Sequence, residues 1–411
     1  MNKNNVLYEH QYGFREKYST KLSLINLLNQ LTTKTDSGEI TVGIFLDFAK
    51  AFDTINHNIL KQKLEHYGIR GLPLDWMCSY LSNRFQFVSN GNNASTLLPI
   101  TCGVPQGSVL GPTLFLLYIN DLPNSTDFFN FRLFADDSSL FHTFQRNVRD
   151  IDLNEVQQKV DAVIKWCTGN KLTINCTKTN YVLFRSRRQH VHKEGGIVIN
   201  GISIKEVESV KFIGVQIDRH LTWKQHIDSV YNSLKMKIGV LFRLRPFVPR
   251  KTLQMIYHAL IQPHITYGLE VWGGTYESYL KRIYLLQKRA VRIMSFKGPR
   301  EHSNALFIDL LILDVFKLYK YVICTVMFDL INQQLPHNLS LYCQVIDHSY
   351  ATRKRENHDF KIIDVKTNVG KQAIAFIGPK LWNIVPMNLR IKMPRYKFRK
   401  LLKRYLIENQ I

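Results

Sequence analysis

The stretch FRLFADDSSLF, residues 131–141, decides the fold of this chain. Two short apolar runs, 131–135 and 138–141, flank the pair Asp136-Asp137. Apolar runs joined by so short a polar turn predict a tight β-hairpin, here with two carboxylates at its tip. A solvated turn is the simplest reading of such a pair, because Asp is common in turns for its local hydrogen bonding.

A third carboxylate, Asp47, stands near the end of the apolar run at residues 42–48. Burying an ionised carboxylate costs free energy unless a metal or another cation compensates it. If this strand pairs with the hairpin, the strand spacing of ~4.8 Å brings the carboxylates close enough to share two divalent ions ~3.5–4 Å apart. Hard oxygen ligands favour Mg²⁺, and such a pair supports in-line phosphoryl transfer. Alone, Asp47 also fits a strand cap.

The charge of the chain points to a polyanionic partner. Its 411 residues include 55 Lys and Arg against 32 Asp and Glu, a net charge of +23, and 45% are hydrophobic, enough for a folded core. The charge is uneven: residues 1–145 are close to neutral, whereas 351–411 carry 15 basic against 4 acidic side chains. Nucleic acid is therefore the expected partner, with a merely basic solvated surface as the alternative.

Cysteine and hydropathy patterns exclude other classes. The six cysteines show no C-x-x-C spacing, so neither a zinc site nor a disulfide framework is expected. The first residues lack the apolar core of a signal peptide, and charges interrupt the longer apolar stretches. We expect a soluble intracellular protein without membrane or zinc partners.

Hydrophobic periodicity predicts an α+β protein. Helices are expected at 20–31, 57–67, 74–83, 112–120 and 147–166, and throughout the part after residue 223. Besides the strands above, the sequence predicts a hairpin at 86–100, a strand at 179–184 and a strand-rich stretch at 196–218.

Three motifs, taken together, closely resemble the palm motifs of reverse transcriptases. They are LDFAKAFD (46–53), GVPQGSVLGP (103–112) and FADD (134–137), in the order found in that family. Their wording is similar to that of non-LTR retrotransposons of the jockey-like LINE group. Further similar stretches cover almost the whole chain: QYGFR (11–15), KL (171–172), FIGV (212–215), LTW (221–223), LQKRA (286–290), TNVGKQ (367–372) and GPKLWN (378–383).

The resemblance implies a right-hand polymerase that copies RNA into DNA by two-metal nucleotidyl transfer. Asp47, Asp136 and Asp137 would be the catalytic metal ligands, joined by the backbone carbonyl of Phe48. The ions would be two Mg²⁺, which Mn²⁺ can replace. Phe52 would be the aromatic gate that rejects a ribose 2′-hydroxyl. The other nucleotide-binding residues implied are Arg15, Gln106, Gly107 and Lys178.

The implied partners are an RNA template, a DNA primer and deoxynucleoside triphosphates. Phe212 and Gly214 fall in the stretch similar to the primer grip. Cations in the basic part would hold the duplex through its phosphates, because a copying enzyme must tolerate every sequence. The candidates are Arg185, Arg187, Lys281, Arg282, Lys288 and Arg289.

The same resemblance divides the chain into partial fingers and palm (1–217), a helical thumb (218–298) and a basic, mainly helical C-terminal domain (299–411). Only ten residues precede Gln11, so the earlier fingers elements of the family are expected to be missing from an amino-terminally truncated chain. A catalytically inactive nucleic-acid-binding remnant is therefore the alternative reading, and a two-metal nuclease is a weaker one. Nuclear or cytoplasmic location and oligomeric state stay open, with the nucleus expected for target-primed integration.

Overall fold

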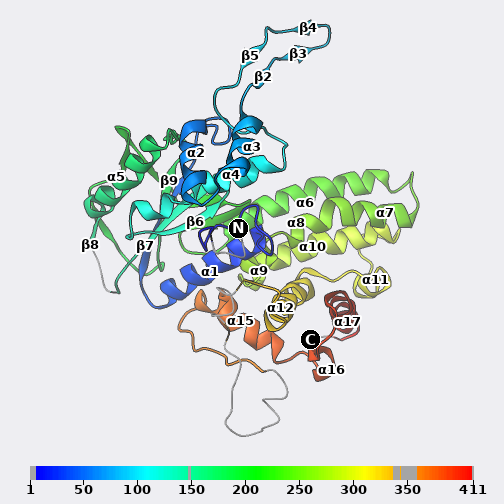
Figure 1. Cartoon of the computed structure of the whole chain (residues 1–411). Helices are drawn as coiled ribbons and strands as arrows, with labels where there is room; N and C mark the ends of the chain where they lie inside the picture. Colours follow the sequence, from blue (N-terminus) through cyan, green and yellow to red (C-terminus); the bar gives the residue numbers. More distant parts are fainter. Residues whose placement is uncertain (1–5, 147–149, 337–342, 344–358, 410–411) are drawn as a thin grey trace. The chain divides into compact units, whose positions relative to one another are not determined.

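The computed structural model describes residues 6–146, 150–336, 343 and 359–409 (Figure 1). The chain forms two compact units, one made of residues up to 23 with 39–208, and the other of 24–38 with 209–411. Both helices and sheet are present, which confirms the predicted α+β class. The division at residues 217 and 298 stays a prediction.

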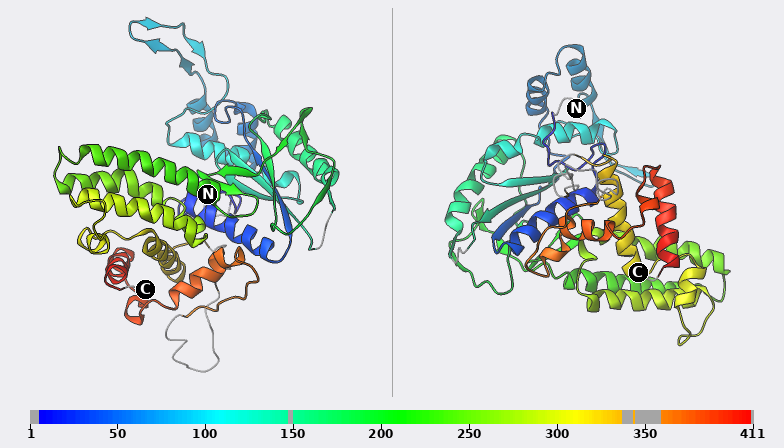
Figure 2. Two further views of the ribbon diagram at one scale, coloured as in Figure 1. Left: turned by 180° about the vertical axis from the view of Figure 1, so that it is seen from behind. Right: turned by 90° about the horizontal axis from the view of Figure 1, so that it is seen from below.

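A five-stranded sheet forms the centre of the first unit (Figure 2). Its strand order is β13-β9-β1-β7-β6. Its strands are β1 (Ile40–Leu46), β6 (Asn130–Phe134), β7 (Asp137–Phe144), β9 (Asn180–Phe184) and β13 (Lys205–Glu206). All seven residues of β1 are buried. A strand covered on both faces is continuously apolar, which is why residues 42–46 show no alternation.

The predicted hairpin at 131–141 is confirmed. β6 and β7 are antiparallel, with Phe134 opposite Asp137, and only Ala135 and Asp136 lie between the strands. β1 pairs with β7 on one side and with β9 on the other, both antiparallel. The strand that carries Asp47 therefore lies beside the hairpin that carries the other two carboxylates.

Helices flank this sheet: α2 (His57–His66), α3 (Leu72–Leu81), α4 (Leu110–Ile119), the 3₁₀ turn η2 (Leu122–Ser125) and α5 (Leu153–Gly169). α5 begins later than predicted, because the Asp152 carboxylate caps it by accepting from the Asn154 N–H. Residues 150–152 form the strand β8 (Asp150–Asp152), and 147–149 lie outside the described residues.

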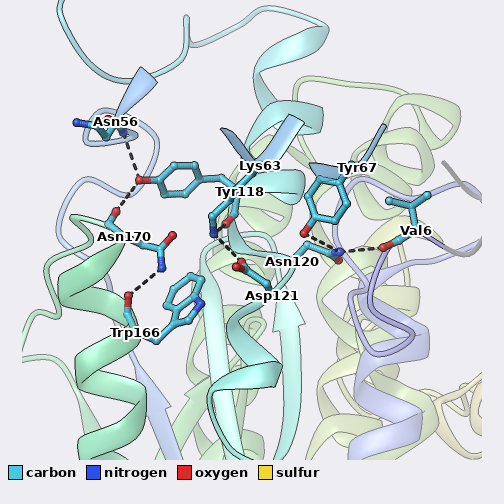
Figure 3. A network of polar contacts seen from close by, with 9 residues as sticks. All are labelled: Val6, Asn56, Lys63, Tyr67, Tyr118, Asn120, Asp121, Trp166 and Asn170. Carbon is cyan, nitrogen blue, oxygen red and sulfur yellow. Dashed lines mark hydrogen bonds and ion pairs between the residues drawn. The ribbon is translucent and has the colours of Figure 1, made fainter. Parts of the chain in front are cut away.

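A polar network ties these helices together (Figure 3). The Lys63 ammonium donates to the Tyr118 carbonyl and to the Asp121 carboxylate, both at 2.6 Å. The Tyr118 hydroxyl donates to the Asn170 carbonyl at 2.5 Å. The Asn120 side chain donates to the Val6 carbonyl and accepts from the Tyr8 N–H. The chain near residue 6 is thereby anchored to the C-terminal end of α4.

The predicted hairpin at 86–100 is a two-stranded ribbon that extends away from α2, α3 and α4 (Figure 1). It consists of β2 (Phe85–Gln86), β3 (Ser89–Asn90), β4 (Asn93–Ala94) and β5 (Leu98–Pro99). The remaining short strands of the first unit are β10 (His192–Glu194), which pairs with β8, and β11 (Val198–Ile199), which pairs with β12 (Ile202–Ser203).

The second unit is mainly helical, as predicted for the part after residue 223. Its one strand pair among the described residues is β14 (Ser209–Phe212) with β15 (Val215–Asp218). The helices are α6 (Lys224–Leu244), α7 (Arg250–Ile256), the π-helix η3 (Tyr257–Ile261), α8 (Gln262–Thr266), α9 (Leu269–Trp272), α10 (Glu277–Met294), α11 (Asn304–Asp309), α12 (Val315–Ile331), η4 (Gly370–Gln372), α15 (Ile374–Trp382), α16 (Met387–Arg390) and α17 (Arg395–Glu408). In the part of the chain that the structure describes, no helix has the length and apolarity needed to cross a membrane.

Helix α1 (Thr20–Asp36) starts in the first unit and continues into the second. Asp36, at its last turn, accepts from the backbone N–H groups of Lys366 and Thr367 at 2.7–3.1 Å. Asn29 accepts from the Ala375 N–H at 3.1 Å. Residues 24–38 are thus held by a segment more than 300 residues further along the chain.

Candidate active site

The three predicted catalytic carboxylates meet at one end of the central sheet. Leu46 is opposite Ser138 in the antiparallel register, so Asp47 and Asp137 occupy the next opposing positions. Opposing residues of an antiparallel pair place their side chains on one face, with Cβ atoms about 4.5–5.5 Å apart. Asp136 precedes Asp137 in the two-residue loop of the hairpin.

The negative charges of these carboxylates affect one another's ionisation. The pKa of Asp137 is raised, first by burial of its carboxyl group and then by the negative charges of Asp136 and Asp47. Burial and like charges both disfavour the ionised form. Divalent cations would relieve this repulsion.

The loop that carries Asp136 has a strained backbone. Ala135 has a φ of 54°, in the left-handed region that a residue with a Cβ seldom adopts. Its N–H donates at 3.1 Å to Oε1 of Gln11, a side chain that is only 1% exposed. The same oxygen accepts from the Gly13 N–H at 2.9 Å. A Cβ on Gly13 would lie 2.5 Å from the Ala135 nitrogen, so the close approach requires glycine.

The sequence does not predict the supporting role of Gln11. This residue belongs to the stretch QYGFR, but its contact with Ala135 joins positions more than 120 residues apart. Backbone hydrogen bonds join this segment to β6: the Tyr12 N–H donates to the Leu133 carbonyl, and the Leu133 N–H donates to the His10 carbonyl. The segment therefore extends the sheet beside β6 and braces the catalytic hairpin.

Arg15 is placed differently from a free phosphate-binding arginine. Its guanidinium donates to the carbonyls of Tyr8 at 2.8 Å and Gln11 at 3.1 Å, and it lies 4.1 Å from the ring centre of Tyr18. Burial lowers the pKa of this guanidinium. These contacts hold the bracing segment together.

Lys178 lies close to the catalytic carboxylates. Its ammonium is 3.9 Å from the Asp47 carboxylate, and both side chains are partly open to solvent. The residues before it pair with the end of β1: the Ala49 N–H donates to Thr173, and the Asn175 N–H donates to the Asp47 carbonyl at 2.7 Å. Within this pairing Phe48, whose side chain is buried, forms a bridge with Ile174.

Phe52 stacks on Phe115 of α4, with ring centres 4.4 Å apart and planes at 23°. Its ring is half-buried. The Phe52 carbonyl accepts from the Val104 N–H at 2.9 Å, and the Gly103 N–H donates to Ile55 at 2.8 Å. The loop GVPQG (103–107) is thus hydrogen-bonded through its backbone to residues 52–55.

Glycine is required in this loop for two reasons. A Cβ at Gly103 would lie 2.7 Å from the Asp53 carbonyl oxygen, whereas a Cβ at Gly107 would meet nothing within 4 Å. Both glycines have positive φ, 84° and 79°. Between them, Gln106 donates to the Asp53 carboxylate at 2.8 Å. Gly107 is therefore an open turn that a ligand can approach closely.

A pocket of about 670 Å³ with a mixed polar and apolar lining opens beside this loop. Its lining includes Lys50, Asp53, Arg84 and the loop residues Cys102 to Gln106. The catalytic carboxylates and Phe52 do not line it. Two cations thus face a cavity that borders the predicted nucleotide-binding loop.

No group of three or more His, Cys, Asp or Glu side chains with metal-binding geometry occurs among residues 6–146, 150–336, 343 and 359–409. The carboxylate donors nevertheless fit a hard cation, which proteins often bind through one or two carboxylates, with water and substrate phosphates completing the shell. The chemistry of the donor set therefore favours Mg²⁺ over a soft metal.

The predicted nucleic-acid contacts lie in both units. In the first, the Arg185 guanidinium donates to the Gln189 carbonyl, and Arg187 is exposed after β9. In the second, Phe212 and Gly214 belong to the β14–β15 hairpin, where Phe212 is buried and Gly214 forms the turn.

The four predicted cations of α10 differ in their surroundings. Arg282 pairs with Asp228 and lies over the Tyr231 ring, and Lys288 lies over the Tyr284 ring. Lys281 and Arg289 are exposed. Two of the four cations, Arg282 and Lys288, thus already contact side chains of their own unit.

Comparison with known proteins supports the resemblance. The family model described as "Reverse transcriptase (RNA-dependent DNA polymerase)" matches residues 1–217. The chain is 30% identical over 297 residues to the RNA-directed DNA polymerase from mobile element jockey of Drosophila melanogaster, covering 69% of this chain and 32% of that protein. It is 28% identical over 305 residues to the probable RNA-directed DNA polymerase from transposon X-element of the same fly, covering 72% and 33%.

Among solved structures, telomerase from Candida albicans matches with a TM-score of 0.39 and 11% identity, over 78% of this chain and 52% of that one. The chain spans about a third of the length of its fly relatives. Because the family model covers more than half of the chain and contains all three carboxylates, this chain belongs to the reverse transcriptase family.

Proposed function

We propose that this chain synthesises DNA on an RNA template, extending a DNA primer with deoxynucleoside triphosphates. The observation that carries the proposal is the position of Asp47, Asp136 and Asp137 at one end of an antiparallel sheet, in the strand register that puts Asp47 beside the β6–β7 hairpin. The two fly relatives are named as RNA-directed DNA polymerases, one of them as a probable one. Membership of their family supports the same activity here.

Asp47 and Asp136, with Asp137 beside them and the Phe48 carbonyl as a further ligand, would hold two Mg²⁺ ions. When bound, these ions activate the primer 3′-hydroxyl and neutralise charge on the triphosphate. Mn²⁺, which takes similar oxygen ligands, would substitute.

The remaining side chains would bind and orient the nucleotide. Lys178, 3.9 Å from Asp47, supplies positive charge beside the site where pyrophosphate leaves. Phe52, fixed by stacking on Phe115, presents a flat ring against the sugar. Gln106 and Gly107 let the backbone approach the nucleotide, and Lys50 and Arg84 add charge along the adjoining pocket. Arg15 would affect nucleotide binding indirectly, because its guanidinium holds the segment that supports the catalytic hairpin.

The basic side chains would grip the primer–template duplex through its phosphates. Arg187, Lys281 and Arg289 are exposed and available for this. Contacts of this kind are independent of sequence and weaken with salt. If the chain acts in target-primed integration, as the resemblance to non-LTR retrotransposons implies, the reaction would take place in the nucleus.

Primer extension on an RNA template with Mg²⁺ and deoxynucleotides tests the function. The wild-type chain should extend the primer, and Asp47→Asn and Asp136→Asn should each lower extension at least 10³-fold, a loss of about 4 kcal/mol of transition-state stabilisation. Asp75→Asn, at an exposed position on α3, is the matched control and should extend normally.

Two results would contradict the proposal. Near wild-type extension by Asp47→Asn would show that the metal ligands lie elsewhere. Retained template binding with no product from any chain, wild type included, would favour the catalytically inactive binding remnant. Circular dichroism and thermal unfolding of each variant would exclude a folding defect as the cause.

A further inference from the structure

The turn between β14 and β15 has an unusual backbone. Phe212 pairs with Val215, so the loop contains only Ile213 and Gly214. Both have positive φ, 42° and 78°, as type I′ turns require. Gly suits the second position, but the first normally holds Asn, Asp or Gly, and a β-branched residue there is an outlier. The turn therefore needs support from outside the hairpin.

Tyr267, between α8 and α9 in the same unit, supplies that support. Its hydroxyl donates to the Ile213 carbonyl at 2.7 Å. Its ring lies against the turn so closely that a Cβ on Gly214 would be 3.0 Å from Cε1. The Tyr267 backbone carbonyl in turn accepts from Nε1 of the buried Trp272 at 2.9 Å. The turn is thus held by the side chain of a residue whose backbone is anchored to Trp272.

The clamped turn is accessible. Gly214 is exposed, and 42% of Tyr267 is open to solvent, whereas Phe212 and Val215 are buried beneath the hairpin. Lys211, on β14, is also exposed. An exposed glycine turn close to a lysine can contact the phosphate backbone of a nucleic acid independently of its base sequence.

We propose that Tyr267 is a positioning residue for the primer: its hydroxyl holds the Ile213-Gly214 turn in the left-handed conformation in which the turn contacts the primer backbone. This inference rests on the proposed polymerase activity. The positive φ of Ile213 agrees with a functional role for the turn, because such backbone conformations persist where the surrounding structure enforces them.

The test is steady-state extension with separate measurement of KM for primer–template and KM for deoxynucleotide. Tyr267→Phe removes only the hydroxyl and should raise KM for primer–template three- to tenfold, as expected for one lost hydrogen bond of about 1 kcal/mol. KM for deoxynucleotide should not change. Tyr276→Phe is the matched control, because Tyr276 is also 42% exposed and lies in the same unit.

A second variant separates positioning from general stability. Ile213→Asn gives the turn the Asn-Gly sequence that favours type I′ without outside help. Adding it to Tyr267→Phe should restore KM for primer–template to within twofold of wild type. An unchanged KM in Tyr267→Phe, or a raised KM that Ile213→Asn does not restore, overturns the inference while leaving the polymerase function standing. Failure of the wild-type chain to extend at all overturns both.

Discussion

Phe52 is the residue whose packing gives the most direct chemical prediction. Its ring stacks on Phe115 at a centre-to-centre distance of 4.4 Å, and in the proposed function this packing would hold it against a bulkier sugar. Phe52→Val should therefore relax discrimination against ribonucleotides by about 10- to 100-fold, the range that a steric pocket achieves against an added hydroxyl. The ratio of kcat/KM for a deoxynucleotide and its ribonucleotide measures it.

Phe87→Val is the control for this experiment, because Phe87 is 57% exposed on the β2–β5 ribbon. Its ratio should equal that of the wild type. Unchanged discrimination in Phe52→Val would assign the ring to core packing alone.

His226 gives the chain a pH dependence at the residue scale. Burial lowers the pKa of its imidazole to about 4, and its Nδ1 accepts from the Gln216 N–H at 3.3 Å, which requires the neutral ring. The unfolded chain binds this proton near pH 6.5, so the contribution to stability is complete above that pH and is lost as pH falls towards 4. The size is on the order of 3 kcal/mol.

His226→Gln tests the assignment by urea unfolding between pH 7 and pH 4. The variant should be less stable than wild type at pH 7 and should lose less free energy of unfolding over this range. Parallel pH profiles for the two chains would show that other groups carry the acid sensitivity.

At the scale of elements, Lys63 joins α2 to the end of α4. Burial lowers the pKa of its ammonium, although the hydrogen bond and charge of Asp121 oppose that shift. Lys63→Met keeps the apolar stem but leaves the Tyr118 carbonyl and the Asp121 carboxylate without their donor. The free energy of unfolding should fall by about 2–3 kcal/mol.

Denaturant unfolding measures this loss, with Lys61→Met as the control, because Lys61 is exposed on the same helix. Adding Asp121→Asn to Lys63→Met should cost less than the sum of the two single changes, since the pair is already broken. Strict additivity would mean that the ion pair contributes nothing.

At the scale of the whole molecule, the net charge of +23 predicts strongly salt-dependent binding to a primer–template duplex. Each phosphate contact contributes about 0.9 to the slope of log K against log salt. Lys281→Gln with Arg289→Gln should lower the slope by about 2. Arg282→Gln should lower it less, because Arg282 is already paired with Asp228. Fluorescence anisotropy over a salt series provides the slopes, and equal effects of all three residues would contradict this ranking.

The sequence by itself determined the elements that depend on neighbouring residues. The hairpin at 131–141 followed from two apolar runs and a two-residue turn, and the ribbon at 86–100 from similar local signals. The resemblance of three motifs to the reverse transcriptase palm singled out Asp47, Asp136 and Asp137, and the structure brings them to one end of the sheet. The start of α5 was misjudged by six residues, because the periodicity does not show which polar residue caps a helix.

Only the tertiary structure decided which distant segments support these elements. Gln11 braces Ala135, Tyr267 clamps Ile213, and Asp36 holds Thr367, all through hydrogen bonds between residues far apart in sequence. The tertiary structure also places the Arg15 guanidinium on the carbonyls of Tyr8 and Gln11. Such partners cannot be predicted from periodicity, because a polar side chain has many possible acceptors and the fold as a whole selects one.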